Sequence, residues 1–171
     1  MQSETPATEK WFALKVRTRN EPVVETILQG KNYETLLPTY TEVRRYSDRV
    51  KKVNAALYPG YVFCRFDPSR RLPILTTPSV EYIVGNGKLP KPVDEREMES
   101  IQRLVDSGVD ARPWPFLREG QKVRIEEGSL SGIEGYLVSI KGDDRLVLSV
   151  ELLQRSVAVH IDRTAVRPLP N

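Results

Sequence analysis

Residues able to act as nucleophiles, general bases or metal ligands are few in this chain and are not grouped. The one histidine, His160, lies in the alternating run 156–161, with no second ligand or nucleophile at a useful spacing. The one cysteine, Cys64, alternates with Val62 and Phe66, as a small buried side chain would. No glycine-rich loop has the spacing of a phosphate-binding loop. We therefore expect no enzyme activity, no metal and no cofactor.

Aromatic residues gather around a Pro-Gly pair, in the segment Tyr58-Pro59-Gly60-Tyr61-Val62-Phe63. The run 61–66 alternates as a strand does, so its odd and even positions lie on opposite faces. If the even positions fill a core, Tyr61 and Phe63 need another explanation. Either a helix packs on their face, or the two rings line an apolar groove for a partner.

Cationic side chains are concentrated in the first half of the chain. Residues 10–71 hold 13 Lys/Arg against 6 Asp/Glu, whereas residues 117–171 hold 8 against 8. Part of this charge lies in 42–55, a predicted hairpin with its tip near Ser47 and Asp48. The hairpin is either a solvated edge ribbon or a basic finger near a phosphate backbone. The candidate nucleic-acid-facing residues are Arg17, Arg19, Arg44, Arg45, Arg49, Lys51 and Lys52.

Hydrophobic periodicity predicts the elements that position these residues. Strands are expected at 11–18, 35–37, 61–66 and 80–84, and helices at 21–30, after Asp67, and at 95–107. Asn20 is the expected cap of the first helix. This order predicts an α+β domain over residues 10–108, with helices packed on a mostly antiparallel sheet. Residues 109–116 are predicted to be a short linker stiffened by Pro113 and Pro115.

The pattern changes after residue 116, where glycines separate short alternating runs and no helical period is present. The runs are 122–125, 135–140, 145–152 and 156–161, with Val166 near the end. Five short strands of this kind predict a small closed barrel. Gly128, Gly132 and Gly135 are the expected turn and close-approach positions.

No apolar run approaches the length of a membrane span, roughly 18 residues. The stretch Met1–Glu9 is polar and lacks the basic start and apolar centre of a signal peptide. We expect a cytoplasmic monomer with no membrane partner.

Four motifs, taken in order, resemble the NusG family over residues 10–168. They are the opening pair Trp11-Phe12, the segment 58–63, the strand entry Ser79-Val80, and the run from Gly120 to Gly135, which resembles a KOW motif. The resemblance implies a NusG-type N-terminal domain at 10–108 and an SH3-like KOW barrel at 117–168.

The resemblance also implies a transcription elongation or antitermination factor that acts by binding. In such a factor the N-terminal domain binds the clamp helices of the largest RNA polymerase subunit, suppresses pausing and lies near non-template or upstream DNA. Mapped onto this chain, a solvent-open groove would be lined by Trp11, Tyr58, Tyr61 and Phe63. The KOW domain would bind termination factor Rho or a small-subunit ribosomal protein through Leu152, Leu153 and Arg155. The alternative is an RNA- or ribosome-binding KOW protein with a supporting N-terminal domain, and the neutral charge after residue 116 counts against it.

Two departures from the family pattern indicate a specialised paralogue, which we group with the RfaH/UpxY type. Leu153 occupies a position where housekeeping members carry an aromatic residue, and the segment 70–77 lacks the His-Thr-Thr-Thr pattern of RfaH-type paralogues. RfaH hides its KOW domain as a helical hairpin. The alternating, glycine-broken pattern here favours a β-barrel instead.

Overall fold

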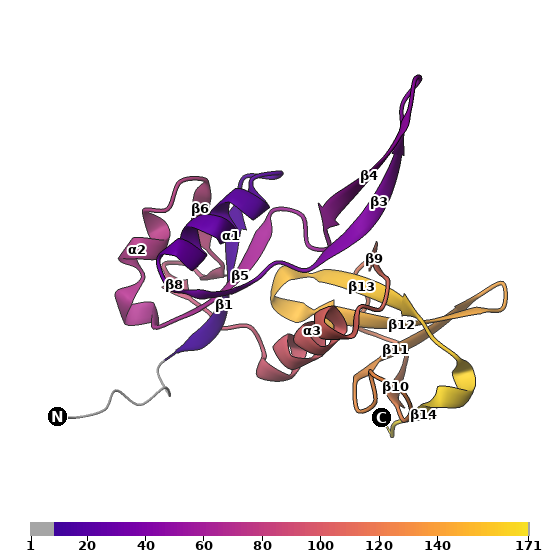
Figure 1. The fold of residues 1–171 in the computed structure, drawn as a ribbon. Helices are drawn as coiled ribbons and strands as arrows, with labels where there is room; N and C mark the ends of the chain where they lie inside the picture. The colour runs from indigo at the N-terminus through magenta and orange to yellow at the C-terminus, as the bar shows by residue number, and fades with distance from the viewer. Residues whose placement is uncertain (1–8, 171) are drawn as a thin grey trace. The chain divides into compact units, whose positions relative to one another are not determined.

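The computed structural model describes residues 9–170, which divide into two compact units. Unit 1 comprises residues 9–37 and 58–95, and unit 2 comprises residues 38–57 and 96–170 (Figure 1). The stretch Met1–Glu9 discussed above lies, apart from Glu9, outside the described residues. No helix in the described part of the chain is long and apolar enough to span a bilayer.

The central element of unit 1 is a four-stranded sheet in the order β2-β5-β1-β6. Its strands are β1 (Lys10–Val16), β2 (Glu34–Leu36), β5 (Tyr61–Phe66) and β6 (Val80–Ile83), and every pairing is antiparallel. The unit also contains α1 (Glu21–Gly30), η2 (Pro68–Arg70), α2 (Leu72–Leu75), β7 (Gly85–Asn86) and β8 (Leu89–Pro90). The strand predicted from the alternation at 61–66 is therefore confirmed residue for residue.

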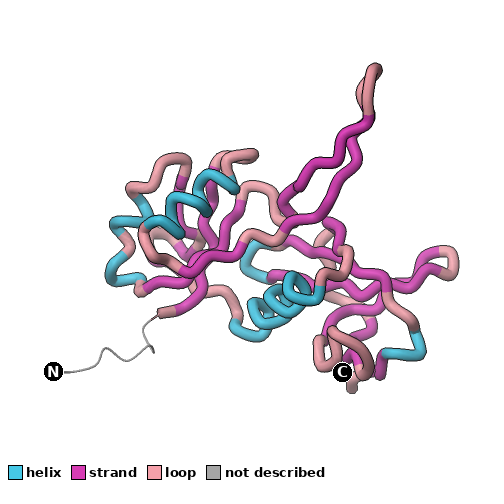
Figure 2. The backbone as a smooth tube through the Cα atoms, viewed as in Figure 1, coloured by secondary structure: helices cyan, strands magenta, loops and turns pink. Residues whose placement is uncertain are grey.

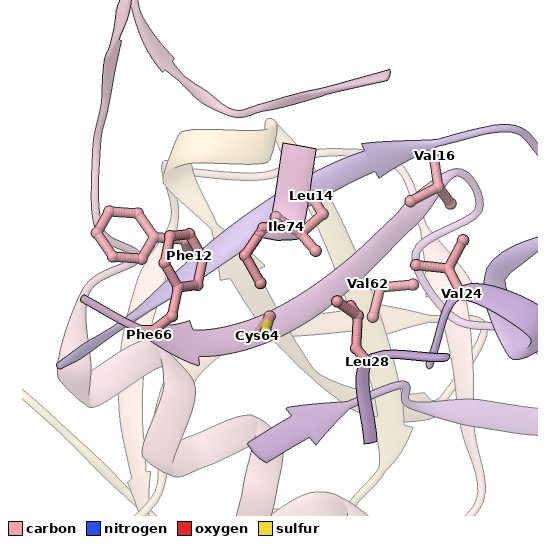
Figure 3. Packing of buried hydrophobic residues seen from close by; sticks show 9 residues of the cluster. All are labelled: Phe12, Leu14, Val16, Val24, Leu28, Val62, Cys64, Phe66 and Ile74. Carbon is pink, nitrogen blue, oxygen red and sulfur yellow. The ribbon is translucent and has the colours of Figure 1, made fainter. Parts of the chain in front are cut away.

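The core of unit 1 lies between one face of this sheet and the two helices (Figure 3). The sheet contributes Phe12, Leu14, Val16, Val62, Cys64 and Phe66, and the helices contribute Val24, Leu28 and Ile74. The Phe12 and Phe66 rings lie 4.7 Å apart between centroids. The predicted cap of α1 is wrong in one respect. The Asn20 side chain makes no capping bond and instead donates to Ser79 Oγ at 2.9 Å.

Unit 2 contains the predicted hairpin, formed by β3 (Thr39–Arg45) and β4 (Val50–Ala56). Figure 2 shows the two strands as a narrow ribbon closed by a short turn. A hydrogen bond from Tyr46 N to Arg49 O, 2.8 Å long, closes that turn. The helix α3 (Glu95–Ser107) has the predicted bounds, and its buried stripe is Met98, Ile101 and Leu104.

The remainder of unit 2 is a six-stranded antiparallel sheet in the order β14-β10-β11-β12-β13-β9. The strands are β9 (Ala111–Trp114), β10 (Gln121–Ile125), β11 (Glu134–Ile140), β12 (Asp143–Val150), β13 (Arg155–His160) and β14 (Val166–Pro168). Short 3-10 turns, η3 (Glu151–Leu153) and η4 (Arg163–Ala165), precede β13 and β14. All five expected strands of the barrel are present. The segment predicted as a linker differs, because residues 111–114 form β9 and pair with β13.

Candidate functional site

The four aromatic residues expected to line an open groove divide into two pairs. The register of β1 and β5 places Trp11, Tyr61 and Phe63 on the face of the sheet opposite the core cluster. Trp11 and Tyr61 are half-buried, whereas Tyr58 is 1% and Phe63 0% exposed. The Tyr58 and Phe63 rings meet edge to face, with centroids 5.5 Å apart. The expectation of four solvent-open rings is therefore wrong for Tyr58 and Phe63, which are buried in the interior. Trp11 and Tyr61 remain accessible.

The Pro-Gly pair forms a tight turn that fixes the start of β5. Tyr61 N donates to Tyr58 O at 3.0 Å, and Gly60 has a φ of +86°, so proline and glycine occupy the central positions of a type II turn. The buried carboxylate of Glu21 accepts a hydrogen bond from Gly60 N at 2.9 Å. The first residue of α1 thus holds this turn in place, and with it the position of Tyr61.

Sequence reasoning missed a third accessible ring on the same face. Tyr82 pairs across the sheet with Lys15, which in turn pairs with Tyr61, and its side chain is 51% exposed. The Lys15 ammonium lies 6.0 Å from the Tyr61 ring centroid and 3.4 Å from Glu81 Oε2. Tyrosines on neighbouring strands therefore flank one cation. The only signal in the sequence was the predicted strand at 80–84, which does not specify the face on which Tyr82 lies.

Arg17 and Arg19 lie on the turn between β1 and α1, and both are exposed. Asn20 N donates to Arg17 O at 3.0 Å, and Arg17 N donates to Ser79 O at 3.0 Å. Arg19 has a φ of 76°, in the left-handed region that non-glycine residues seldom adopt. The turn is therefore tied to the start of β6, and it presents both guanidinium groups to solvent.

The five hairpin cations all lie at the exposed end of the β3–β4 ribbon. They are Arg44, Arg45, Arg49, Lys51 and Lys52. Arg44 makes a 3.4 Å ion pair with Glu42, and Arg49 lies over the Tyr46 ring at 5.6 Å. The base of the hairpin is anchored by a hydrogen bond from Leu57 N to Pro38 O and by Arg112 over the Tyr40 ring.

The candidate partner-binding residues of the barrel also differ in exposure. Arg155 is exposed and Leu152 is half-buried, but Leu153 is 5% exposed. The expectation that Leu153 offers an apolar contact to a partner is therefore not met in this structure. Gly128 and Gly132 have φ values of +88° and +92°, which suits turns. Gly135 allows β11 and β12 to lie close together, because a Cβ there would lie 2.6 Å from Val147 O.

The residues considered for catalysis belong to different units. His160 Nδ1 lies 3.1 Å from Asp143 Oδ1 on the barrel surface. Cys64 lies in the core of unit 1, where burial raises the pKa of its thiol to about 12. Among residues 9–170 no three His, Cys, Asp or Glu side chains are placed to hold a metal ion.

Comparison with known proteins identifies the class to which this architecture belongs. The family described as "Transcription termination factor nusG" matches residues 9–102. A Lactococcus lactis protein named "Transcription termination/antitermination protein NusG" is 33% identical over 132 residues, covering 74% of this chain and 70% of that protein. A Campylobacter jejuni protein of the same name is 27% identical over 170 residues, covering 91% of this chain and 94% of that protein. The chain belongs to the NusG family.

A solved structure supports the fold. The structure described as "Domain interaction in Thermotoga maritima NusG" matches with a TM-score of 0.57, covering 97% of this chain and 100% of that one. Its sequence is 19% identical, so the likeness bears on fold alone. The predicted α+β class, with an antiparallel N-terminal sheet followed by an all-β C-terminal part, is confirmed.

Proposed function

We propose that this chain is a transcription elongation and antitermination factor that binds RNA polymerase through its N-terminal domain. The observation that carries the proposal is its family membership, with NusG relatives that align along almost the whole chain. The proposed contact is with the clamp helices of the largest polymerase subunit, and the proposed effect is to suppress pausing or termination.

Trp11 and Tyr61 are the proposed apolar contacts, joined by Tyr82. All three retain exposed ring surface, and Tyr61 and Tyr82 flank Lys15 on one face of the sheet. Full burial of a large apolar side chain contributes about 1.5–3 kcal/mol, and aromatic residues dominate binding energy at interfaces. In this proposal Tyr58 and Phe63 are buried and make no direct contact with the polymerase.

Non-template or upstream DNA is the proposed partner of the cationic residues. Arg17 and Arg19 are exposed on a tied turn, and the hairpin cations lie on a ribbon with few competing carboxylates. Contacts of arginine and lysine with phosphates supply affinity and orientation without reading sequence.

The proposed partner of the barrel is Rho or a small-subunit ribosomal protein. Arg155 and Leu152 remain the accessible candidates for that contact, whereas Leu153 is buried. Whether the chain is a specialised paralogue stays a prediction.

The test is retention of the full chain on RNA polymerase that is free of nucleic acid. Trp11→Ala combined with Tyr61→Ala should reduce retention by about tenfold or more. Val23→Ala is the matched control, because Val23 is a 56% exposed apolar residue on α1. The proposal fails if the aromatic variant is retained fully while Leu152→Ala with Arg155→Ala abolishes retention. That result would favour the alternative, in which the KOW domain carries the binding.

A further inference from the structure

The tip of the β3–β4 hairpin, residues 43–52, contributes no buried side chain to the fold. Every residue in this stretch is exposed, including Val43 at 51%, Tyr46 at 48% and Val50 at 62%. Within the described part of the chain β3 and β4 pair only with each other. Packing therefore does not explain why these residues form the tip, and their charged and aromatic side chains face solvent.

The strand register separates the tip into two faces. Paired residues of an antiparallel ladder project to the same side. One face carries the pair Arg44 and Lys51, and the next positions toward the turn, Tyr46 and Arg49, continue it. The opposite face carries Val43 with Lys52, and Arg45 with Val50. The aromatic ring thus shares its face with three cations.

Tyr46 is held in place by those cations. The Arg49 guanidinium lies 5.6 Å from the ring centroid, within the range of a cation–π interaction. Arg44 lies two residues from Tyr46 on the same face of the ribbon, and the Tyr46 side chain is the chief cause of a raised pKa at the Arg44 guanidinium. The backbone bond from Tyr46 N to Arg49 O fixes the turn beneath the ring. A half-exposed ring oriented in this way is an ordered platform at the end of a ribbon.

We propose that the hairpin tip binds single-stranded nucleic acid, with an unpaired base stacked on Tyr46 and the flanking phosphates held by Arg44, Arg49 and Lys51. Five cations against one carboxylate in residues 43–52 match a polyanion. A flat ring beside guanidinium groups matches a base, because stacking on aromatic side chains is how unpaired bases are held. The inference extends the proposed function, in which the same hairpin faces DNA, by naming the base contact and its residue.

The test measures binding of the full chain to labelled oligonucleotides of about 12 nucleotides, within the range of known single-strand sites. The oligonucleotides are single-stranded DNA, single-stranded RNA, duplex DNA, and a DNA strand with abasic positions. Tyr46→Ala should weaken binding to both intact single strands by about tenfold, and Tyr46→Leu should do the same. Tyr46→Phe should stay within about twofold of the parent, because the ring remains.

Val50→Ala is the matched control, since Val50 is an exposed apolar residue on the opposite face of the same hairpin. It should bind the single strands as the parent does. The effect of Tyr46→Ala should vanish on the abasic strand, because no base remains to stack. Unfolding midpoints of the variants should match the parent, because Tyr46 lies on an exposed turn.

The proposal is overturned if Tyr46→Ala binds single strands like the parent, or if it weakens duplex and abasic binding equally. It is also overturned if an acidic peptide displaces the strand at equal charge concentration, because charge alone would then explain the tip. Polymerase retention is measured on the same variants. If Tyr46→Ala loses oligonucleotide binding but is retained normally on polymerase, the hairpin-tip contact is supported independently of the polymerase contact. If Trp11→Ala binds oligonucleotides normally but is lost from polymerase, the result concerns the proposed polymerase contact alone.

Discussion

At the scale of the residue, Cys64 shows how burial governs reactivity. Its side chain is fully buried in the core of unit 1, and burial raises the pKa of the thiol to about 12. The thiolate is the reactive form, so the folded chain should react slowly with thiol reagents at pH 8. We expect native labelling to be at least about a hundredfold slower than labelling in urea. A native rate close to the unfolded rate would show that the cysteine is accessible.

Gly135 is a second residue whose environment makes a measurable prediction. A Cβ at this position would lie 2.6 Å from Val147 O, so β11 and β12 would have to separate. Gly135→Ala should therefore cost about 1–3 kcal/mol in free energy of unfolding, measured with urea. Gly30→Ala is the control, since nothing lies within 4 Å of its Cβ and it ends α1. It should be neutral or stabilise by up to about 1 kcal/mol. Equal losses at the two sites would contradict the close-approach role of Gly135.

At the scale of the element, carboxylates on the barrel strands and turns predict how stability depends on pH. Hydrogen bonds from Arg145 to Asp143 and from Arg124 to Glu134 lower the pKa of each carboxyl. Ser139 and Arg163 do the same for Asp144, and the backbone and hydroxyl of Thr164 do so for Asp162. A carboxyl whose pKa is lowered by folding stabilises the fold above its unfolded value, and that stability is lost as pH falls through the folded value. In unit 1, burial instead raises the pKa of Glu25, which has the opposite sign.

We therefore expect the barrel strands to lose hydrogen-exchange protection before the sheet of unit 1 as pH falls from about 4.5 to about 3. Each carboxylate is at the surface, so the individual effects are small. Asp144→Asn should reduce the acid sensitivity of β12 and leave that of β5 unchanged. If unit 1 opens first, the carboxylates of the barrel do not control acid stability.

Several elements were predictable because their periods are strong, and others were not. The strict alternation at 61–66 and the apolar stripe of 95–107 fixed β5 and α3 to the residue. The strand β9 was missed because Pro113 argues against a strand, but β9 is at the edge of its sheet, where a missing donor is tolerated. Alternation placed Phe63 on the correct face of the sheet. It carries no information about what covers that face, so the burial of Tyr58 and Phe63 was not predictable.

At the scale of the whole molecule, charge is divided along the chain. The cations of residues 10–71 outnumber the carboxylates by more than two to one, whereas residues 117–171 are neutral. Two matched variants of the full chain distinguish the effect of where the cations lie from the effect of total charge. One replaces Arg44, Arg49 and Lys51 of the hairpin with glutamine, and the other replaces Lys122, Lys141 and Arg167 of the barrel, all exposed. Each removes three charges from a net +3 and leaves zero.

If nucleic acid binds to the hairpin, only the first variant should lose affinity. The plot of log affinity against log salt should also become less steep by up to about 2, because each single-strand phosphate contact contributes about 0.7 to that slope. The barrel variant has the same net charge and should keep both the affinity and the slope of the parent. Fluorescence anisotropy over a series of salt concentrations measures both quantities. Equal losses in the two variants would mean that overall charge, rather than the hairpin, attracts nucleic acid, and the assignment of the basic N-terminal region to that role would fail.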